Sequence, residues 1–196
     1  MSFEHEEHIK EIISSSIDAK EDLLKSTECI EMINKLARFS LDALVEGGKI
    51  IFAGNGGSFG DSQHISAEFT SRFLFDRKPL ASIALGTNSS SMSAIGNDYG
   101  YEYVFSRELE ALGKSEDIFV PISTSGNSSN ILEAINIANE KNIKTIGLTG
   151  SNQGKMTGMC ECISVPSTDT GRIQECHILI GHIVCGLVEK SYFKDS

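Results

Sequence analysis

Positive charge is scarce in this sequence. Its 196 residues include 17 Lys and Arg against 27 Asp and Glu, which gives a formal net charge of −10 at pH 7. Such a chain has no electrostatic reason to bind nucleic acid or an anionic membrane surface, because both are themselves negatively charged. If the chain binds a phosphate group, it must do so with local dipoles and hydrogen bonds rather than with a basic surface.

Long apolar runs are missing as well. No run approaches the roughly 20 apolar residues of a membrane-spanning helix. The N-terminus, from Met1 to Glu7, is acidic and lacks the apolar centre of a secretory signal. The five cysteines are odd in number and not paired as in zinc sites, and Cys160-x-Cys162 alone is a weak metal signal. We therefore expect a reduced, cytoplasmic protein.

Short apolar runs alternate with helical patterns along most of the chain. Strands are expected at residues 49–53, 81–85, 117–122, 145–149 and 162–166. Helices are expected at residues 4–25, 27–45, 61–73, 88–96, 101–112 and 171–192, with a further helical pattern after residue 128. This alternation predicts an α/β fold, a three-layer α/β/α sandwich with a five-stranded, mostly parallel sheet.

One domain is expected, because 196 residues that are 40% hydrophobic support one sizeable core but not two. Within this single domain, we expect residues 47–196 to form the α/β core and residues 1–46 to form N-terminal helices. The apolar stripes of these helices need burial that so small a domain does not readily offer. The helix at 171–192 is apolar nearly all round, which is typical of a buried helix. Packing against partner subunits is one plausible answer.

A hydroxyl-rich loop at residues 123–128 (Ser-Thr-Ser-Gly-Asn-Ser) lies between the third expected strand and a helical pattern. Amide groups at a helix N-terminus bind anions, and Ser and Thr hydroxyls can donate further hydrogen bonds, so the loop suits a phosphate. The chain lacks a Gly-x-x-x-x-Gly-Lys-Ser/Thr motif, which favours a phosphomonoester over a nucleotide. A simple N-cap cluster in a polar loop is the alternative. The turn at 54–58 (Gly-Asn-Gly-Gly-Ser) also follows a strand, so both loops are expected at the ligand-binding edge of the sheet.

Two pairs of polar residues have helical spacing. His64 and Glu68 are one turn apart, and Gln174 and His182 share a face of the largely apolar last helix. Two imidazoles, a carboxylate and an amide oxygen would make a plausible zinc site if the two helices met. From spacing alone, two ordinary helix pairs that never meet remain the preferred interpretation.

Five motifs in this order resemble the sedoheptulose 7-phosphate isomerase (phosphoheptose isomerase) family of the sugar-isomerase (SIS) domain superfamily. They are the 54–58 turn, Asp61-Ser62-Gln63-His64 with Glu68, residues 94–100 (Ala-Ile-Gly-Asn-Asp-Tyr-Gly), the 123–128 loop, and Arg172-Ile173-Gln174-Glu175 with His182. The resemblance spans about residues 50–190. The 123–128 loop alone indicates only the superfamily, and the other motifs make the match more specific. Phe59-Gly60, Asn88 and residues 168–171 depart from the usual pattern, but none of them removes a ligand-type residue.

The resemblance implies a catalytic pair, Glu68 and His182, and a homotetramer whose active sites are shared between subunits. It implies one zinc ion per subunit, held by His64, Glu68, Gln174 and His182. The sugar phosphate would be bound by Asn55, Gly56, Gly57, Ser58, Glu68, Asn97, Asp98, Ser123, Thr124, Ser125, Ser128 and Gln174. The implied reaction converts D-sedoheptulose 7-phosphate into D-glycero-D-manno-heptose 7-phosphate, a precursor of activated heptose for bacterial surface polysaccharide.

Two rival functions stay open. Some SIS-domain relatives are non-catalytic interaction proteins, such as the factor that associates with the bacterial replication initiator. Others isomerise a different sugar phosphate, as arabinose 5-phosphate isomerases do, but those usually carry extra C-terminal domains. The combination of His64 and Glu68 with Gln174 and His182 favours the heptose isomerase.

Overall fold

A five-stranded parallel sheet forms the centre of the computed structural model, which describes residues 5–152 and 154–193. The strands lie in the order β2-β1-β3-β4-β5, and every neighbouring pair is parallel. Their bounds are β1 (Ile50–Gly54), β2 (Ser82–Ala84), β3 (Ile118–Ile122), β4 (Lys144–Gly150) and β5 (Glu161–Val165). β1 and β3 are buried along their whole length, which explains their continuous apolar sequences.

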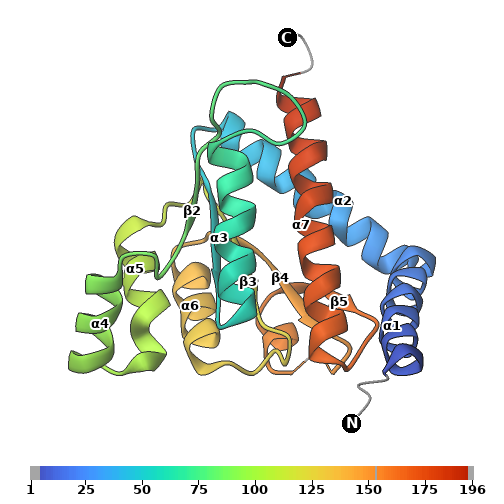
Figure 1. The fold of residues 1–196 in the computed structure, drawn as a ribbon. Coiled ribbons are helices and arrows are strands. Elements are labelled where there is room, and N and C mark those ends of the chain that lie inside the picture. Colours follow the sequence, from blue (N-terminus) through green and yellow to red (C-terminus); the bar gives the residue numbers. More distant parts are fainter. Residues whose placement is uncertain (1–4, 153, 194–196) are drawn as a thin grey trace.

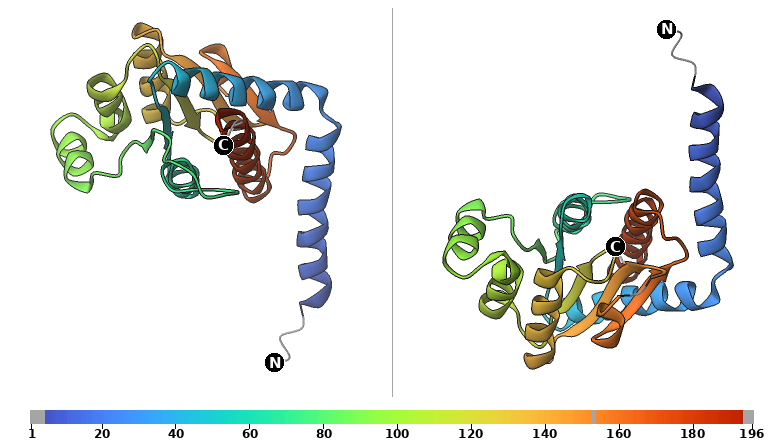
Figure 2. Two further views of the ribbon diagram at one scale, coloured as in Figure 1. Left: turned by 90° about the horizontal axis from the view of Figure 1, so that it is seen from above. Right: turned by 90° about the horizontal axis from the view of Figure 1, so that it is seen from below.

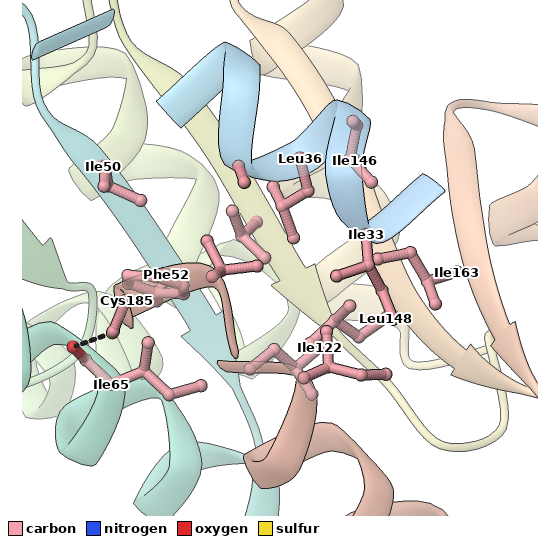
Figure 3. Close-up of a cluster of buried hydrophobic side chains, with 14 of the residues drawn as sticks. Ile33, Leu36, Ile50, Phe52, Ile65, Ile122, Ile146, Leu148, Ile163 and Cys185 are labelled. Atoms are coloured by element: carbon pink, nitrogen blue, oxygen red, sulfur yellow. Dashed lines mark hydrogen bonds between the residues drawn. The ribbon is translucent and has the colours of Figure 1, made fainter. Parts of the chain in front are cut away.

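Helices cover both faces of the sheet (Figure 1). They are α1 (Glu6–Lys25), α2 (Thr27–Val45), α3 (Gly57–Thr70), α4 (Ser89–Asp98), α5 (Val104–Leu112), α6 (Ser129–Glu140) and α7 (Thr170–Tyr192), with 3₁₀ turns η1 (Tyr101–Tyr103) and η2 (Met156–Gly158). One buried cluster joins the sheet to α1, α2, α3 and α7, and a second joins its other face to α5 and α6. In Figure 3, side chains from α2, α3 and the strands meet in the first cluster. The predicted three-layer α/β/α sandwich is confirmed.

The last helix, α7, lies beside α3 on the same face of the sheet (Figures 1 and 2). The two helices run in parallel, since Gln174 lies against Gly57 and Gly181 lies against Ile65 further along. A Cβ atom on Gly181 would be 2.4 Å from the Ile65 side chain, so a larger residue here would force that side chain or the two helices to shift. The contact brings the middle of α7 against the middle of α3, although the two are far apart in the sequence.

The first helix stands away from the body of the molecule (Figure 2). Ser16 donates a hydrogen bond to Glu175 at 2.5 Å, and Arg172 donates one to the Ile12 carbonyl at 2.7 Å. Of the α1 side chains, Ala19 and Leu23 are buried. Its other large apolar residues are exposed: Ile9, Ile12, Ile13, Ile17 and Leu24. The predicted amphipathic helix is therefore present, but most of its apolar stripe has no cover within this chain.

Several expected boundaries were wrong. α3 begins at Gly57 rather than residue 61 and ends at Thr70 rather than residue 73. The helix expected at 101–112 is divided into η1 and α5. α4 extends to Asp98 rather than ending at residue 96, so Asn97 and Asp98 belong to its last turn. The expected start of the first helix, residue 4, lies outside the described residues. None of the helices in the described ranges combines the length and hydrophobicity that a membrane crossing requires.

Candidate active site

Three polar side chains converge where the middle of α7 lies against α3. The Nε2 atom of His64 lies 3.1 Å from Glu68 Oε1 and 3.3 Å from His182 Nε2. The ligand atoms of the three residues all lie within 4.8 Å of one another. Glu68 and His182 are partly buried, whereas His64 is exposed. α3 and α7 therefore bring His64, Glu68 and His182 together within one chain, which the spacing alone did not favour.

The arrangement suits a divalent metal ion. Two imidazole nitrogens and a carboxylate oxygen are ligand types that zinc takes, with bonds of about 2.0–2.2 Å. Two such ligands at a tetrahedral angle lie about 3.4 Å apart, close to the 3.1 and 3.3 Å separations around His64. Two of the three separations therefore match those of ligands that share one metal ion, and all three ligand atoms lie within 4.8 Å of one another.

Phe73, which sequence reasoning did not single out, holds the ring of His182 in place. The two rings stack with their centroids 5.4 Å apart and an interplanar angle of 22°. The His64 ring meets His182 on an edge, with centroids 5.1 Å apart. His182 is thus held between two rings, which limits the orientations that its Nε2 atom can take.

The hydroxyl-rich loop leads directly into α6. Ser128 occupies the N-cap position but makes no hydrogen bond to the amides of the helix, and its hydroxyl pairs with Ser123 Oγ at 3.1 Å. Gly126 has a positive φ of 64°, which turns the backbone here. Because no side chain caps α6, its N-terminal dipole and amides remain available to an anion. This favours the phosphate interpretation over a simple capping cluster.

The turn after β1 presents a second uncapped helix end at the same edge of the sheet. α3 starts after Gly56, whose φ is +55°, and has no side-chain cap. Gly54 pairs with Ile122 in the sheet register, so the loops after β1 and β3 leave the sheet side by side. The N-termini of α3 and α6 therefore open onto the same edge, as expected for the ligand-binding edge of a parallel sheet.

An amide pair joins these two loops. Asn55 Nδ2 donates to Asn130 Oδ1, and Asn130 Nδ2 donates to Asn55 Oδ1, both at 2.9 Å. The hydroxyl of Tyr101 also donates to Asn55 Oδ1, at 3.3 Å. Asn130 is buried, and nothing in its sequence context indicated this role. The predicted binding residue Asn55 is therefore locked by partners from α6 and η1.

The other predicted site residues lie around this edge. The side-chain amide of Gln174 lies against Gly57. A Cβ atom built on Gly57 would be only 2.5 Å from Gln174 Nε2. Gly57 is two turns before His64, about 10 Å along α3. Gln174 thus lies beside the first turn of α3. Ser58 is buried.

Asn97 and Asp98 are exposed at the end of α4, where Asn97 Nδ2 donates to Asp98 Oδ1 at 2.8 Å. Across residues 5–152 and 154–193, neither side chain makes a hydrogen bond to any predicted site residue other than its neighbour in this pair.

Asp61 is a further polar group on the site face of α3, one turn before His64. Its Oδ2 atom is buried and has no hydrogen-bond partner among the described residues. Burial raises the pKa of the Asp61 carboxyl, and the nearby charge of His64 lowers it in part, leaving a net increase. The carboxyl is therefore easier to protonate than an ordinary surface aspartate.

Comparison with known proteins identifies relatives over nearly the whole chain. Residues 15–150 match the model of the SIS domain. The phosphoheptose isomerase of Aneurinibacillus thermoaerophilus is 52% identical over 190 residues, 96% of each chain. Phosphoheptose isomerase 2 of Campylobacter jejuni is 51% identical over 187 residues, 95% of this chain and 93% of that protein. The solved phosphoheptose isomerase of Neisseria gonorrhoeae superposes with a TM-score of 0.89 at 40% identity, over 95% of this chain and all of that one. This chain belongs to the phosphoheptose isomerase family of SIS-domain proteins.

Proposed function

We propose that this chain is an aldose–ketose isomerase that converts D-sedoheptulose 7-phosphate into D-glycero-D-manno-heptose 7-phosphate. The observation that carries the proposal is the convergence of Glu68 and His182 with His64 on two neighbouring helices. The family membership supports the same reaction, since relatives about 50% identical over almost their full length are named phosphoheptose isomerases.

The phosphate end of the substrate binds at the uncapped N-terminus of α6. Backbone amides and the hydroxyls of Ser123, Thr124, Ser125 and Ser128 hold it by hydrogen bonds, which a chain with a net charge of −10 needs in place of a basic surface. The sugar lies along the neighbouring start of α3. It is contacted by Asn55, Gly56, Gly57, Ser58, Gln174, Asn97 and Asp98. Fixing the phosphate positions the reacting carbons at a distance from it.

Proton transfer between C1 and C2 falls to Glu68 and His182. A ketose and an aldose interconvert through a cis-enediol, which needs a base at carbon and an acid–base group at the oxygens. We assign the carbon proton to the Glu68 carboxylate and the oxygen protons and ring opening to the His182 imidazole. Phe73 stacks on that imidazole and so limits the orientation of its ring.

His64, Glu68 and His182 also form the proposed metal site, with one zinc ion per subunit as the first candidate. Gln174, whose amide lies against Gly57 in the first turn of α3, is the fourth proposed ligand. When bound, such an ion would polarise the substrate oxygens as a Lewis acid.

The biological setting is part of the same proposal. The chain would act in the cytoplasm as a homotetramer with active sites shared between subunits. Residues 1–46 would serve assembly, and residues 47–196 would form the catalytic core of a single domain. The product would supply activated heptose for lipopolysaccharide, capsule or another surface glycan.

The decisive experiment follows sedoheptulose 7-phosphate directly. When purified protein converts it in deuterated water, deuterium from the solvent should be incorporated at C1 or C2. Glu68→Gln retains shape but loses basicity, so turnover should fall by about 10²- to 10⁴-fold while the substrate still binds. His182→Gln should behave alike, and Gln63→Ala on the exposed side of α3 is the matched control. Substrate binding without turnover in the unaltered protein would favour a non-catalytic sugar phosphate-binding role.

A further inference from the structure

A fully buried ion pair lies behind the candidate active site. Arg77, in the segment between α3 and β2, donates from Nε to Glu189 Oε1 at 2.8 Å. The exposed fractions of the two side chains are 2% and 0%. Glu189 lies on α7, two turns after His182. In Figure 1, the segment after α3 arches across to this end of α7.

The guanidinium of Arg77 holds the end of α3. Nη2 donates to the Glu68 carbonyl at 2.8 Å, and Nη1 donates to the carbonyls of Phe69 at 2.7 Å and Ser71 at 2.9 Å. The last carbonyls of a helix have no partner within the helix, so one side chain here satisfies several of them. The turn that is fixed in this way carries Glu68.

The carboxylate of Glu189 holds the other half of the site. It accepts hydrogen bonds from the backbone amides of Leu74 at 2.7 Å and Phe73 at 3.1 Å. These bonds fix the backbone that places the Phe73 ring on His182. Burial alone would raise the pKa of the Glu189 carboxyl, but the two amides and Arg77 outweigh it and leave the pKa below its usual value.

A buried ion pair is weak evidence for stability, because an apolar pair of similar size often stabilises a fold as well. What an apolar pair does not supply is a set of directed hydrogen bonds to both sides of the site. Only the planar fork of arginine can reach the Glu68 carbonyl and the Glu189 carboxylate at the same time.

We propose that Arg77 and Glu189 are positioning residues of the isomerase site. Through the Glu68 carbonyl on one side and the Phe73 ring on the other, one network sets how Glu68 and His182 face each other. This inference rests on the proposed function for its catalytic consequence, but its geometric consequence is independent of the substrate.

The test compares Glu189→Gln and Arg77→Lys with a matched control, Asp117→Asn. Asp117 is also a buried carboxylate that accepts two backbone amides and a lysine, but it lies before β3 at the opposite edge of the sheet. All variants are assayed at a temperature at which circular dichroism shows them folded. In the two network variants kcat should fall roughly 10- to 100-fold with KM changed less than about threefold, because misplacement of catalytic groups by about 1 Å has costs of this size. The control should keep its kcat.

Two further measurements separate this inference from the proposed function. Zinc affinity, measured by competition with a chelating dye, should weaken about tenfold in the network variants only. In a crystal structure of Glu189→Gln, the ring of His182 should leave the Phe73 stack and its Nε2 should move away from His64. If the unaltered protein is inactive on sedoheptulose 7-phosphate, the proposed function fails, while the crystal structure still decides the positioning role. Unchanged His182 geometry in that variant, or kcat within twofold of the unaltered protein, would overturn the inference.

Discussion

Two histidines of α7 have opposite surroundings. His182 is partly exposed at the candidate active site, whereas His177, on the sheet side of the helix, is fully buried. His177 Nε2 lies 3.2 Å from the Thr149 carbonyl oxygen, and its Nδ1 has no hydrogen-bond partner among the described residues. Burial lowers the pKa of His177 to about 4, because a charged imidazole would lose its hydration there. The folded state therefore holds this ring neutral.

We predict that His177 makes the fold sensitive to mild acid. The folded pKa is about 4 and the unfolded value is 6.5, so the unfolded chain takes up the proton first. The contribution of neutral His177 to the free energy of unfolding is fully present above pH 6.5 and is lost as the pH falls towards 4. By pH 5 the free energy of unfolding should be lower by about 2 kcal/mol. Urea unfolding at pH 7.5 and 5.0 measures the loss. His177→Gln keeps a donor for the Thr149 carbonyl but does not titrate, so its stability should change less between the two pH values. Exposed His8→Gln is the control, and equal losses in all three proteins would contradict the prediction.

At the scale of residues, the sequence identified groups that carry chemistry but not the groups that hold them. His64, Glu68 and His182 stand out through residue type, helical spacing and motif. Arg77 and Glu189 do not, because their bond joins residues 112 positions apart and neither belongs to a recognisable motif. Asn130 likewise looks like an ordinary residue in the first turn of a helix. Such partners are defined by tertiary contacts, which a single sequence does not record.

At the scale of elements, strands were easier to predict than the start of α3. Each buried strand is a short apolar run, and all five were placed to within two residues at either end. Residues 54–58 are rich in glycine, which by local propensity indicates a turn. The structure instead starts the helix at Gly57. The positive φ of Gly56 turns the backbone sharply, so that only Asn55 and Gly56 separate the end of β1 from the start of α3. A Cβ on Gly54 would be 2.4 Å from the Ser58 carbonyl oxygen, so the glycine lets α3 begin directly above the end of β1.

The loop before α6 should determine the affinity for the substrate phosphate. Ser125→Ala and Ser128→Ala each remove a hydroxyl that would donate to a charged group, worth about 1.5–3 kcal/mol. We expect KM for sedoheptulose 7-phosphate to rise roughly 10- to 100-fold in each variant, with part of the loss in kcat where positioning suffers. Steady-state kinetics measure both effects. Exposed Ser115→Ala, before β3 at the other edge of the sheet, is the control. If both loop variants have unchanged kinetics, the loop is purely structural.

At the scale of the whole molecule, exposed apolar side chains gather on the N-terminal helices and α7. Ile13 and Ile17 of α1 are 56% and 53% exposed. Ile30 of α2 and Ile183 and Leu187 of α7 are also exposed, and they line a common groove with Ile33. Apolar surface gathered in this way marks an interface more often than free surface. The apolar residues of α7 therefore divide into two sets. One set packs in the core, and the other set is exposed on the surface of the chain.

We predict a homotetramer held together by these helices. Complete burial of one isoleucine contributes about 1.5–3 kcal/mol, so several per subunit can offset the entropy lost on association. Light scattering at micromolar concentration should give about four times the chain mass of 21.3 kDa. Replacing Ile13 and Ile17 by Asp should shift the protein to smaller species, whereas Leu112→Asp on α5, on the opposite face of the sheet, should not. Chelation should reduce activity without dissociating the tetramer, because apolar contacts rather than a metal would join the subunits. A mass of one chain for the unaltered protein would exclude this assembly, and the exposed face of α1 would then need another partner.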